Sequence, residues 1–200
     1  MDTLIFQLKP AYFVVGFLFL CCSTKGNEGS KNIEGSHKQD SVVTTQGPKI
    51  IYTVSANHFF SSNISKDKFL IELYGTDTLK ASITFKIMNS VGDLIYSTEF
   101  ESRALLDYGL PENPSKREKA EYILLRMNNF FKEENFVTPA IRSDEIYDKD
   151  YYGIIGESMW NKVKSNSHSI GFYYSLWEGS QSWITFYEKH KQVLKYKTCC

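Results

Sequence analysis

The sequence lacks an excess of charge of either sign. Its 200 residues include 23 basic and 23 acidic side chains, so the formal net charge is zero at neutral pH. Binding of nucleic acid or of an anionic lipid surface over a broad area requires Lys and Arg residues clustered on one face. The composition therefore argues against such partners, and we expect no nucleic acid to bind.

The sequence also lacks the common catalytic motifs. It contains no GxxxxGK[ST], GxGxxG, GxSxG or HExxH pattern, so phosphoryl transfer, dinucleotide redox chemistry and the usual hydrolase templates have no local support. Its histidines, at positions 37, 58, 168 and 190, are dispersed along the chain. We therefore predict no catalytic residues, no metal and no cofactor.

No apolar run is long enough to cross a membrane unaided. Residues 11–22 read AYFVVGFLFLCC, and Lys9 and Pro10 precede them. A spanning helix needs about 20 apolar residues, so this run crosses only if it extends back to Leu4. Twelve residues are the length of a signal-peptide core, which indicates export.

The end of this run carries a further signal, because it stops at two adjacent cysteines and polar residues follow at once. The pattern resembles a bacterial lipoprotein signal. The resemblance covers residues 1–22 only and implies a signal peptide over 1–21, with lipid, such as palmitate, on Cys22 or on Cys21. The usual motif has a small residue before the modified cysteine, and size favours Cys22, since Leu20 precedes Cys21. An uncleaved signal anchor, or a soluble protein that buries this run, are the alternatives.

Residues 22–48 form a polar stretch without a periodic apolar stripe. We expect a flexible tether, whose composition gives a reach of roughly 25–30 Å. Such a tether would hold a domain clear of the surface of the cell envelope.

Residues 49–200 have the composition of a single globular domain. Strand patterns come in series, and the alternation of Ile83, Phe85 and Ile87 with polar residues marks the clearest hairpin. Ser115 and Glu118 form a capping-box pattern before an apolar stripe at helical spacing, which predicts one long helix. The expected strands are 50–54, 69–74, 81–88, 94–100, 170–177, 183–188 and 192–198, with a short helix over 157–164. The order predicts an α+β fold, with a mostly antiparallel sheet of six or seven strands packed on the long helix.

The last hairpin is rich in aromatic residues. A five-residue loop would place Trp177 opposite Trp183, with Tyr173 opposite Tyr187 on the same face. These four residues are our candidate ligand-binding site. They form either a second buried layer or an exposed platform for a sugar ring or for an apolar anchor of a partner.

Residues 144–156 bear a trace of a calcium-binding loop. Asp148, Asp150 and Gly153 match loop positions one, three and six, but Met159 stands where a bidentate glutamate is required. A solvated acidic loop is therefore the better interpretation.

The four cysteines do not suggest a framework of two disulfides. If Cys21 and Cys22 belong to export and anchoring, Cys199 and Cys200 are the only thiols of the domain. A bond between adjacent cysteines is strained, so free thiols or an intermolecular bridge compete with it.

Together these features predict a membrane-anchored exported lipoprotein of the bacterial envelope, periplasmic or exposed at the surface. Its domain would bind a protein or a glycan without catalysis. One alternative is a small envelope enzyme with an acidic cleft built from Asp148, Asp150 and Glu157 near Tyr151 and Tyr152. Another is an inhibitor or immunity-type protein that blocks a foreign enzyme.

Overall fold

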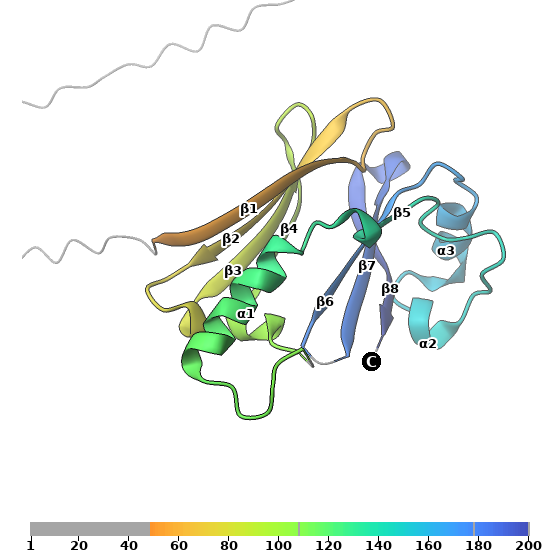
Figure 1. The fold of residues 1–200 in the computed structure, drawn as a ribbon. Helices are drawn as coiled ribbons and strands as arrows, with labels where there is room; N and C mark the ends of the chain where they lie inside the picture. Colours follow the sequence, from red (N-terminus) through yellow and green to blue (C-terminus); the bar gives the residue numbers. More distant parts are fainter. Residues whose placement is uncertain (1–48, 108, 178, 200) are drawn as a thin grey trace, which may run out of the picture. The chain divides into compact units, whose positions relative to one another are not determined.

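The first four strands of the domain form one antiparallel meander, which we call sheet A (Figure 1). The computed structural model describes residues 49–107, 109–177 and 179–199, all within the unit Thr44–Cys200. Buried apolar residues pair across β2 and β3, where Phe69 lies opposite Ile87 and Ile71 opposite Phe85. The strands are β1 (Ile50–Phe59), β2 (Lys66–Tyr74), β3 (Ser82–Met88) and β4 (Leu94–Glu101). All four predicted strands are confirmed, and β1 extends beyond its predicted end.

The remaining strands form a second antiparallel sheet, sheet B, in the order β5-β6-β7-β8. Its strands are β5 (Phe136–Val137), β6 (Gly171–Leu176), β7 (Ser180–Tyr187) and β8 (Gln192–Cys199). The pairing of β7 with β8 shifts between Trp183 and Ile184, which lie opposite Lys197 and Lys195. Tyr196 is thus the extra residue of a β-bulge.

The predicted long helix is α1 (Lys116–Asn128), and its capping box is present. The Ser115 hydroxyl accepts a hydrogen bond from the Glu118 amide at 3.2 Å, and the Ser115 amide donates to the Glu118 carboxylate at 2.7 Å. The predicted short helix is α3 (Gly156–Lys164), and a single turn, α2 (Lys149–Tyr152), precedes it. Short 3-10 turns complete the chain: η1 (Thr78–Lys80), η2 (Ser102–Leu105), η3 (Glu133–Asn135) and η4 (Glu188–His190).

The prediction of one sheet with six or seven strands is not confirmed. The chain is a mixed α and β fold with two separate four-stranded antiparallel sheets and few helices. The sheets meet through side chains: the rings of Phe85 in β3 and Phe172 in β6 lie 5.6 Å apart. Phe130, just after α1, contacts both rings. The inner face of sheet A therefore packs against sheet B as well as against α1, rather than against a helix alone.

The opposite face of sheet B is covered by a second, smaller core. Tyr196 of β8 and Trp183 of β7 pack there against α2 and α3, which contribute Tyr152, Trp160 and Val163. Figure 1 shows α2 and α3 on the side of sheet B away from sheet A. Both faces of sheet B are therefore apolar, as the sequence of the last hairpin requires.

One edge of sheet B has no partner strand along most of β6, because β5 pairs only with Gly171 and Phe172. Arg126 of α1 reaches across this edge, where its guanidinium donates to the Ser175 hydroxyl at 2.9 Å and forms an ion pair with Asp107. Burial lowers the pKa of Arg126. A charged side chain held over a strand edge blocks pairing with another chain.

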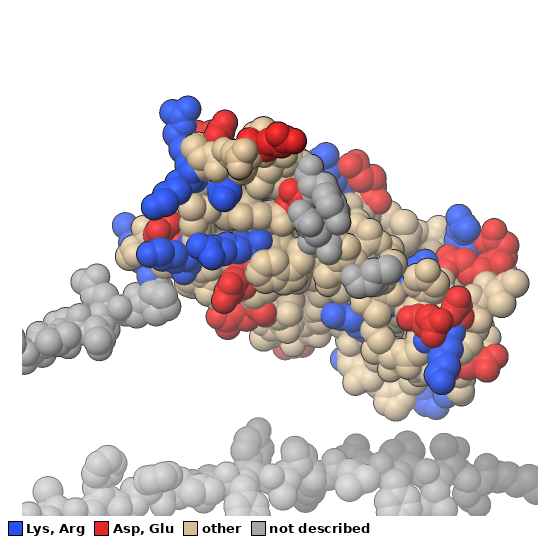
Figure 2. Space-filling model, turned by 90° about the horizontal axis from the view of Figure 1, so that it is seen from below, with Lys and Arg blue, Asp and Glu red and all other residues tan. Residues whose placement is uncertain are grey.

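The charged surface is mixed. On the face seen in Figure 2, acidic and basic side chains both occur, and uncharged residues cover most of the area. Among the described residues, no helix is long and apolar enough to cross a membrane.

The capping box gives a direct test of the helix boundary. Replacement of Ser115 by Ala removes the acceptor for the Glu118 amide, so we expect the free energy of unfolding to fall by about 1 kcal/mol in urea denaturation. Ser97, an exposed serine of β4, provides the control. Ser97→Ala should change the free energy of unfolding by less than about 0.5 kcal/mol. Equal effects of the two substitutions would contradict the capping geometry.

Candidate functional site

The four aromatic residues predicted to share one face do not all do so. The register of the hairpin is wrong in our prediction: Trp183 lies opposite Tyr173, and Leu176 lies opposite Ser180. The connection is shorter than expected, so Trp177 falls in the turn with a positive φ of 58° and is 50% exposed. Tyr187 stacks on His190, with ring centroids 5.3 Å apart. Only Tyr173 and Trp183 remain as a pair.

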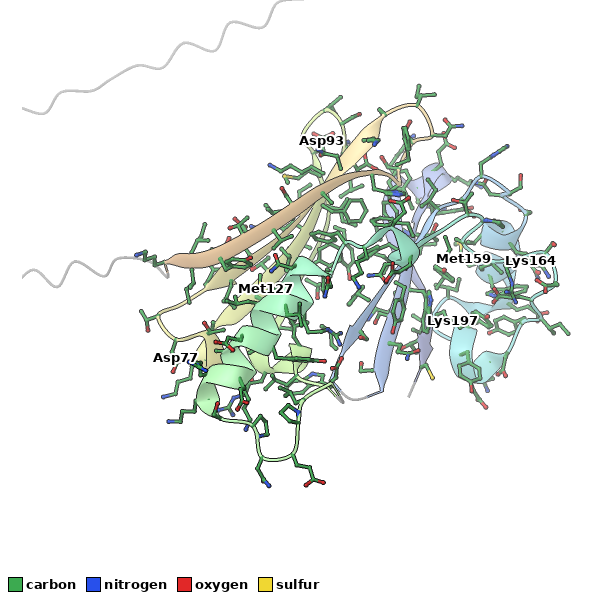
Figure 3. The ribbon with its side chains drawn as sticks, viewed as in Figure 1. Asp77, Asp93, Met127, Met159, Lys164 and Lys197 are labelled. Atoms are coloured by element: carbon green, nitrogen blue, oxygen red, sulfur yellow. The ribbon has the colours of Figure 1, made fainter. Side chains whose placement is uncertain are left out.

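Trp183 is the centre of a layered cluster on the outer face of sheet B. The Tyr173 ring lies 5.0 Å from the Trp183 ring between centroids. The Lys197 ammonium lies 5.0 Å from the Trp183 centroid and 5.3 Å from that of Tyr152. Lys197 extends from β8 toward α2 (Figure 3). The ammonium is thus held by cation–π contacts between two aromatic rings.

Glu145 completes the cluster from the loop before α2. Its carboxylate accepts a hydrogen bond from the Tyr152 hydroxyl and lies 3.9 Å from both the Lys197 ammonium and the Arg142 guanidinium. Lys164 of α3 donates to the backbone carbonyl of Glu145 at 2.5 Å. A single carboxylate therefore joins β8, α2 and the preceding loop.

Tyr196 fixes the same loop from beneath. Its hydroxyl donates to the backbone carbonyl of Ala140 at 2.7 Å, and a β-carbon on Gly171 would lie only 2.6 Å from that hydroxyl oxygen. Glycine at position 171 therefore lets the Tyr196 side chain cross β6 and reach the loop. The only sequence signal for this close approach of Tyr196 was a glycine near the start of a predicted strand.

Between the loop and the sheet lies a hollow of about 170 Å³, which we call the outer pocket. Its walls include the apolar side chains of Val137, Pro139 and Ala140 and the aromatic rings of Trp183 and Tyr196. Its charged rim consists of Arg142, Glu145 and Lys197. The full lining is Val137, Pro139, Ala140, Arg142, Glu145, Trp183, Tyr196 and Lys197. Of the predicted site residues, the outer pocket includes only Trp183, and Tyr173 supports its ring.

Tyr173 also borders a second hollow of about 310 Å³ beside α1. Arg126 and Lys132 line it too, but Arg126 is already paired with Asp107, and the Lys132 ammonium lies 3.5 Å from Glu134. The cations of this hollow therefore have acidic partners within the protein.

The acidic loop has a structural role at the start of α2. The Asp148 carboxylate accepts a hydrogen bond from the Asp150 amide at 2.8 Å and caps the first turn of α2. Asp150 and Glu157 are exposed, and Tyr152 is buried against Glu145. In residues 49–107, 109–177 and 179–199, no group of three or more His, Cys, Asp or Glu side chains is placed to hold a metal ion.

The three histidines of the domain occupy different places. His58 stacks on Phe136 with centroids 3.7 Å apart, and its Nε2 lies 3.0 Å from the Glu133 carboxylate. His168 lies in the loop before β6, and His190 stacks on Tyr187. Cys199 ends β8. The predicted signal, the tether, Cys21, Cys22 and Cys200 lie outside the described residues.

The buried tyrosines make the stability of this region dependent on pH. Burial raises the pKa of Tyr196 and of Tyr152, and the hydrogen bond to Glu145 raises that of Tyr152 further. In the unfolded chain these phenols ionise near pH 10, so above that pH the unfolded chain binds fewer protons than the folded protein. The contribution of these two phenols to stability should therefore be fully present below about pH 10 and be lost as the pH rises above it. Urea denaturation at increasing pH measures this loss of stability, and tyrosinate absorbance measures the ionisation of the phenols.

Tyr152→Phe is the matched variant for this measurement. It removes one of the perturbed phenols, so the alkaline loss of stability should be smaller than in the unsubstituted protein. Full tyrosinate absorbance from a protein that keeps its native near-UV circular dichroism would contradict the burial of these hydroxyls.

Comparisons with known proteins give no relative for this chain: no protein-family model, no curated protein and no solved structure matches it.

Proposed function

We propose that this chain is an exported lipoprotein, anchored at the bacterial envelope through Cys22 or Cys21, whose domain binds a protein partner at the outer pocket without catalysis. The anchor is supported by the apolar run at 11–22 and the cysteines that end it. The binding site is supported by the composition and shape of the outer pocket.

The outer pocket has the anatomy of an interface hot spot. Hot spots combine Trp, Tyr and Arg residues around a small desolvated pocket, with a polar rim. A volume of about 170 Å³ is well below the roughly 300–1,000 Å³ of sites for drug-sized ligands, so it suits one side chain of a partner. The apolar wall would contact that side chain, and Arg142, Glu145 and Lys197 would contact its polar surroundings.

Exposed apolar residues also occur in the segment that borders the pocket. Val137 lines the pocket, and Ile146, Tyr151 and Ile154 follow in the segment that carries Glu145 and α2; all four are exposed. Large apolar side chains on the segment that borders a pocket favour contact with a protein. Ile146 is 85% exposed, so its side chain is placed to meet a partner directly.

A sugar stacked on Trp183 is the less favoured ligand. Stacking needs an open ring face, and Tyr173 and Lys197 already lie within 5.0 Å of the Trp183 centroid. Displacement of Lys197 would also break its contacts with Tyr152 and Glu145. This arrangement is the single observation that favours a protein anchor over a glycan at the outer pocket.

Site-specific cross-linking in envelope preparations tests the interface. A photo-reactive residue in place of Ile146 should form a discrete cross-linked product, whereas one in place of Val91, which is 80% exposed in the β3–β4 turn, should not. Arg142 is exposed on the rim, and Arg142→Glu should abolish the product by charge reversal. Arg117→Glu reverses an exposed arginine on α1 and should leave it intact. Equal products at Ile146 and Val91 would contradict the interface.

Acyl labelling tests the anchor. Cells expressing the chain should incorporate a labelled fatty acid into it, and Cys22→Ser should remove the label if Cys22 is the modified residue. Loss on Cys21→Ser alone would move the modification to Cys21, and absence of label from the unsubstituted chain would overturn the anchor. Cys199→Ser serves as the control and should keep the label.

A further inference from the structure

A second pocket, which we call the junction pocket, lies where loops of the two halves of the domain meet. Its volume is about 390 Å³, within the range of small-molecule sites. The β1–β2 loop contributes Phe60 to Ile64, and the α3–β6 loop contributes Asn166 and His168 to Ile170. Phe186 of β7 and Glu188 of η4 complete the lining. None of these residues belongs to the outer pocket.

Hydrogen bonds hold both loops in place: the first to a residue of β2, the second within the loop itself. Asp67 is fully buried, and its carboxylate accepts from the Ser61 amide at 2.5 Å and from the Ser61 hydroxyl at 2.9 Å. The Asn166 side chain accepts from the His168 amide at 3.1 Å, and the Ser169 hydroxyl donates to the Asn166 carbonyl at 2.7 Å. A preformed site lowers the entropic cost of binding.

Seven of the eleven residues in the lining have polar side chains. They include the hydroxyls of three serines and the amides of two asparagines, which both donate and accept hydrogen bonds, together with one imidazole and one carboxylate. No Lys or Arg is among the lining residues of this pocket, so an anionic ligand would find no cation within it. The polar residues are Ser61, Ser62, Asn63, Asn166, His168, Ser169 and Glu188.

Several of these groups have unused hydrogen-bonding capacity. Within the described part of the chain, the side chains of Asn63 and Glu188 and the ring of His168 have no hydrogen-bond partner, whereas those of Ser61 and Asn166 are engaged. Phe60, Ile170 and Phe186 supply an apolar floor. A ligand with hydroxyls around its edge and C–H groups on its faces matches both surfaces.

We propose that the junction pocket binds one unit of a neutral saccharide. The hydroxyl groups of a saccharide donate and accept hydrogen bonds, as do the serine and asparagine side chains that line the pocket. The C–H face of a pyranose ring would pack on the half-buried ring of Phe186. Lys162 and Lys189 line a neighbouring hollow of about 70 Å³, so acidic sugars are the competing ligands in the test.

The test is a binding measurement on the purified full-length chain. We expect millimolar or tighter binding from at least one member of a panel of glucose, galactose, N-acetylglucosamine and their di- and trisaccharides. Asn63→Ala, His168→Ala and Glu188→Ala each remove one unengaged group at an exposed position, and each should weaken binding by about three- to tenfold through the loss of one hydrogen bond. Asn57→Ala, at an exposed position of β1, should not weaken it.

Three results would overturn the proposal. The first is no binding by any neutral saccharide of the panel, and the second is binding that the three pocket variants leave unchanged. The third is tighter binding of glucuronic acid or N-acetylneuraminic acid than of every neutral sugar, which would assign the ligand to the cations of the neighbouring hollow. Circular dichroism of each variant establishes that it is folded.

Discussion

The contact between Phe85 and Phe172 is the interaction on which the rest of the structure depends. Phe85 comes from the middle of sheet A and Phe172 from the start of β6, and both side chains are fully buried. Rings of β4, β6 and the end of α1 contact Phe85 edge to face, and a ring of β2 stacks with it. Aromatic pairs at these distances bury large areas and favour such geometry. This contact joins the two sheets through side chains on their faces and not through hydrogen bonds between edge strands. The sheets therefore remain separate.

That arrangement creates both pockets. Sheet B is buried by sheet A on one side, and α2 and α3 cover the other side incompletely, which leaves the outer pocket beside Trp183. At the end where the β1–β2 loop meets the loop before β6, the two halves leave the junction pocket. The two sites differ in chemistry because one lies over an aromatic and charged face and the other between polar loops.

In the proposed function, Lys197 determines which ligand suits the outer pocket. A lysine between two aromatic rings and near a carboxylate gains cation–π and ionic contacts at once, and these persist because the group is only partly solvated. The same contacts cover the ring face of Trp183. The site therefore offers an apolar wall and a charged rim in place of a flat aromatic platform, and this geometry favours a side chain of a protein partner.

Local patterns in the sequence determined the elements: seven of the strands, α1 with its capping box, and α3 follow from alternation, helical spacing and turn residues, which act over a few positions. The two-residue β5, the single turn α2 and the register of the last hairpin could not be predicted, because they depend on contacts such as Phe136 with Phe172. Of the four residues predicted for the binding site, Trp183 and Tyr173 lie in contact, and whether they bind a ligand stays a prediction. The charged members of the outer pocket, Glu145 and Lys197, lie 52 residues apart and are brought together by packing alone. Sequence by itself determined what each segment forms; tertiary structure decided which faces meet, since burial depends on partners that are distant in the chain.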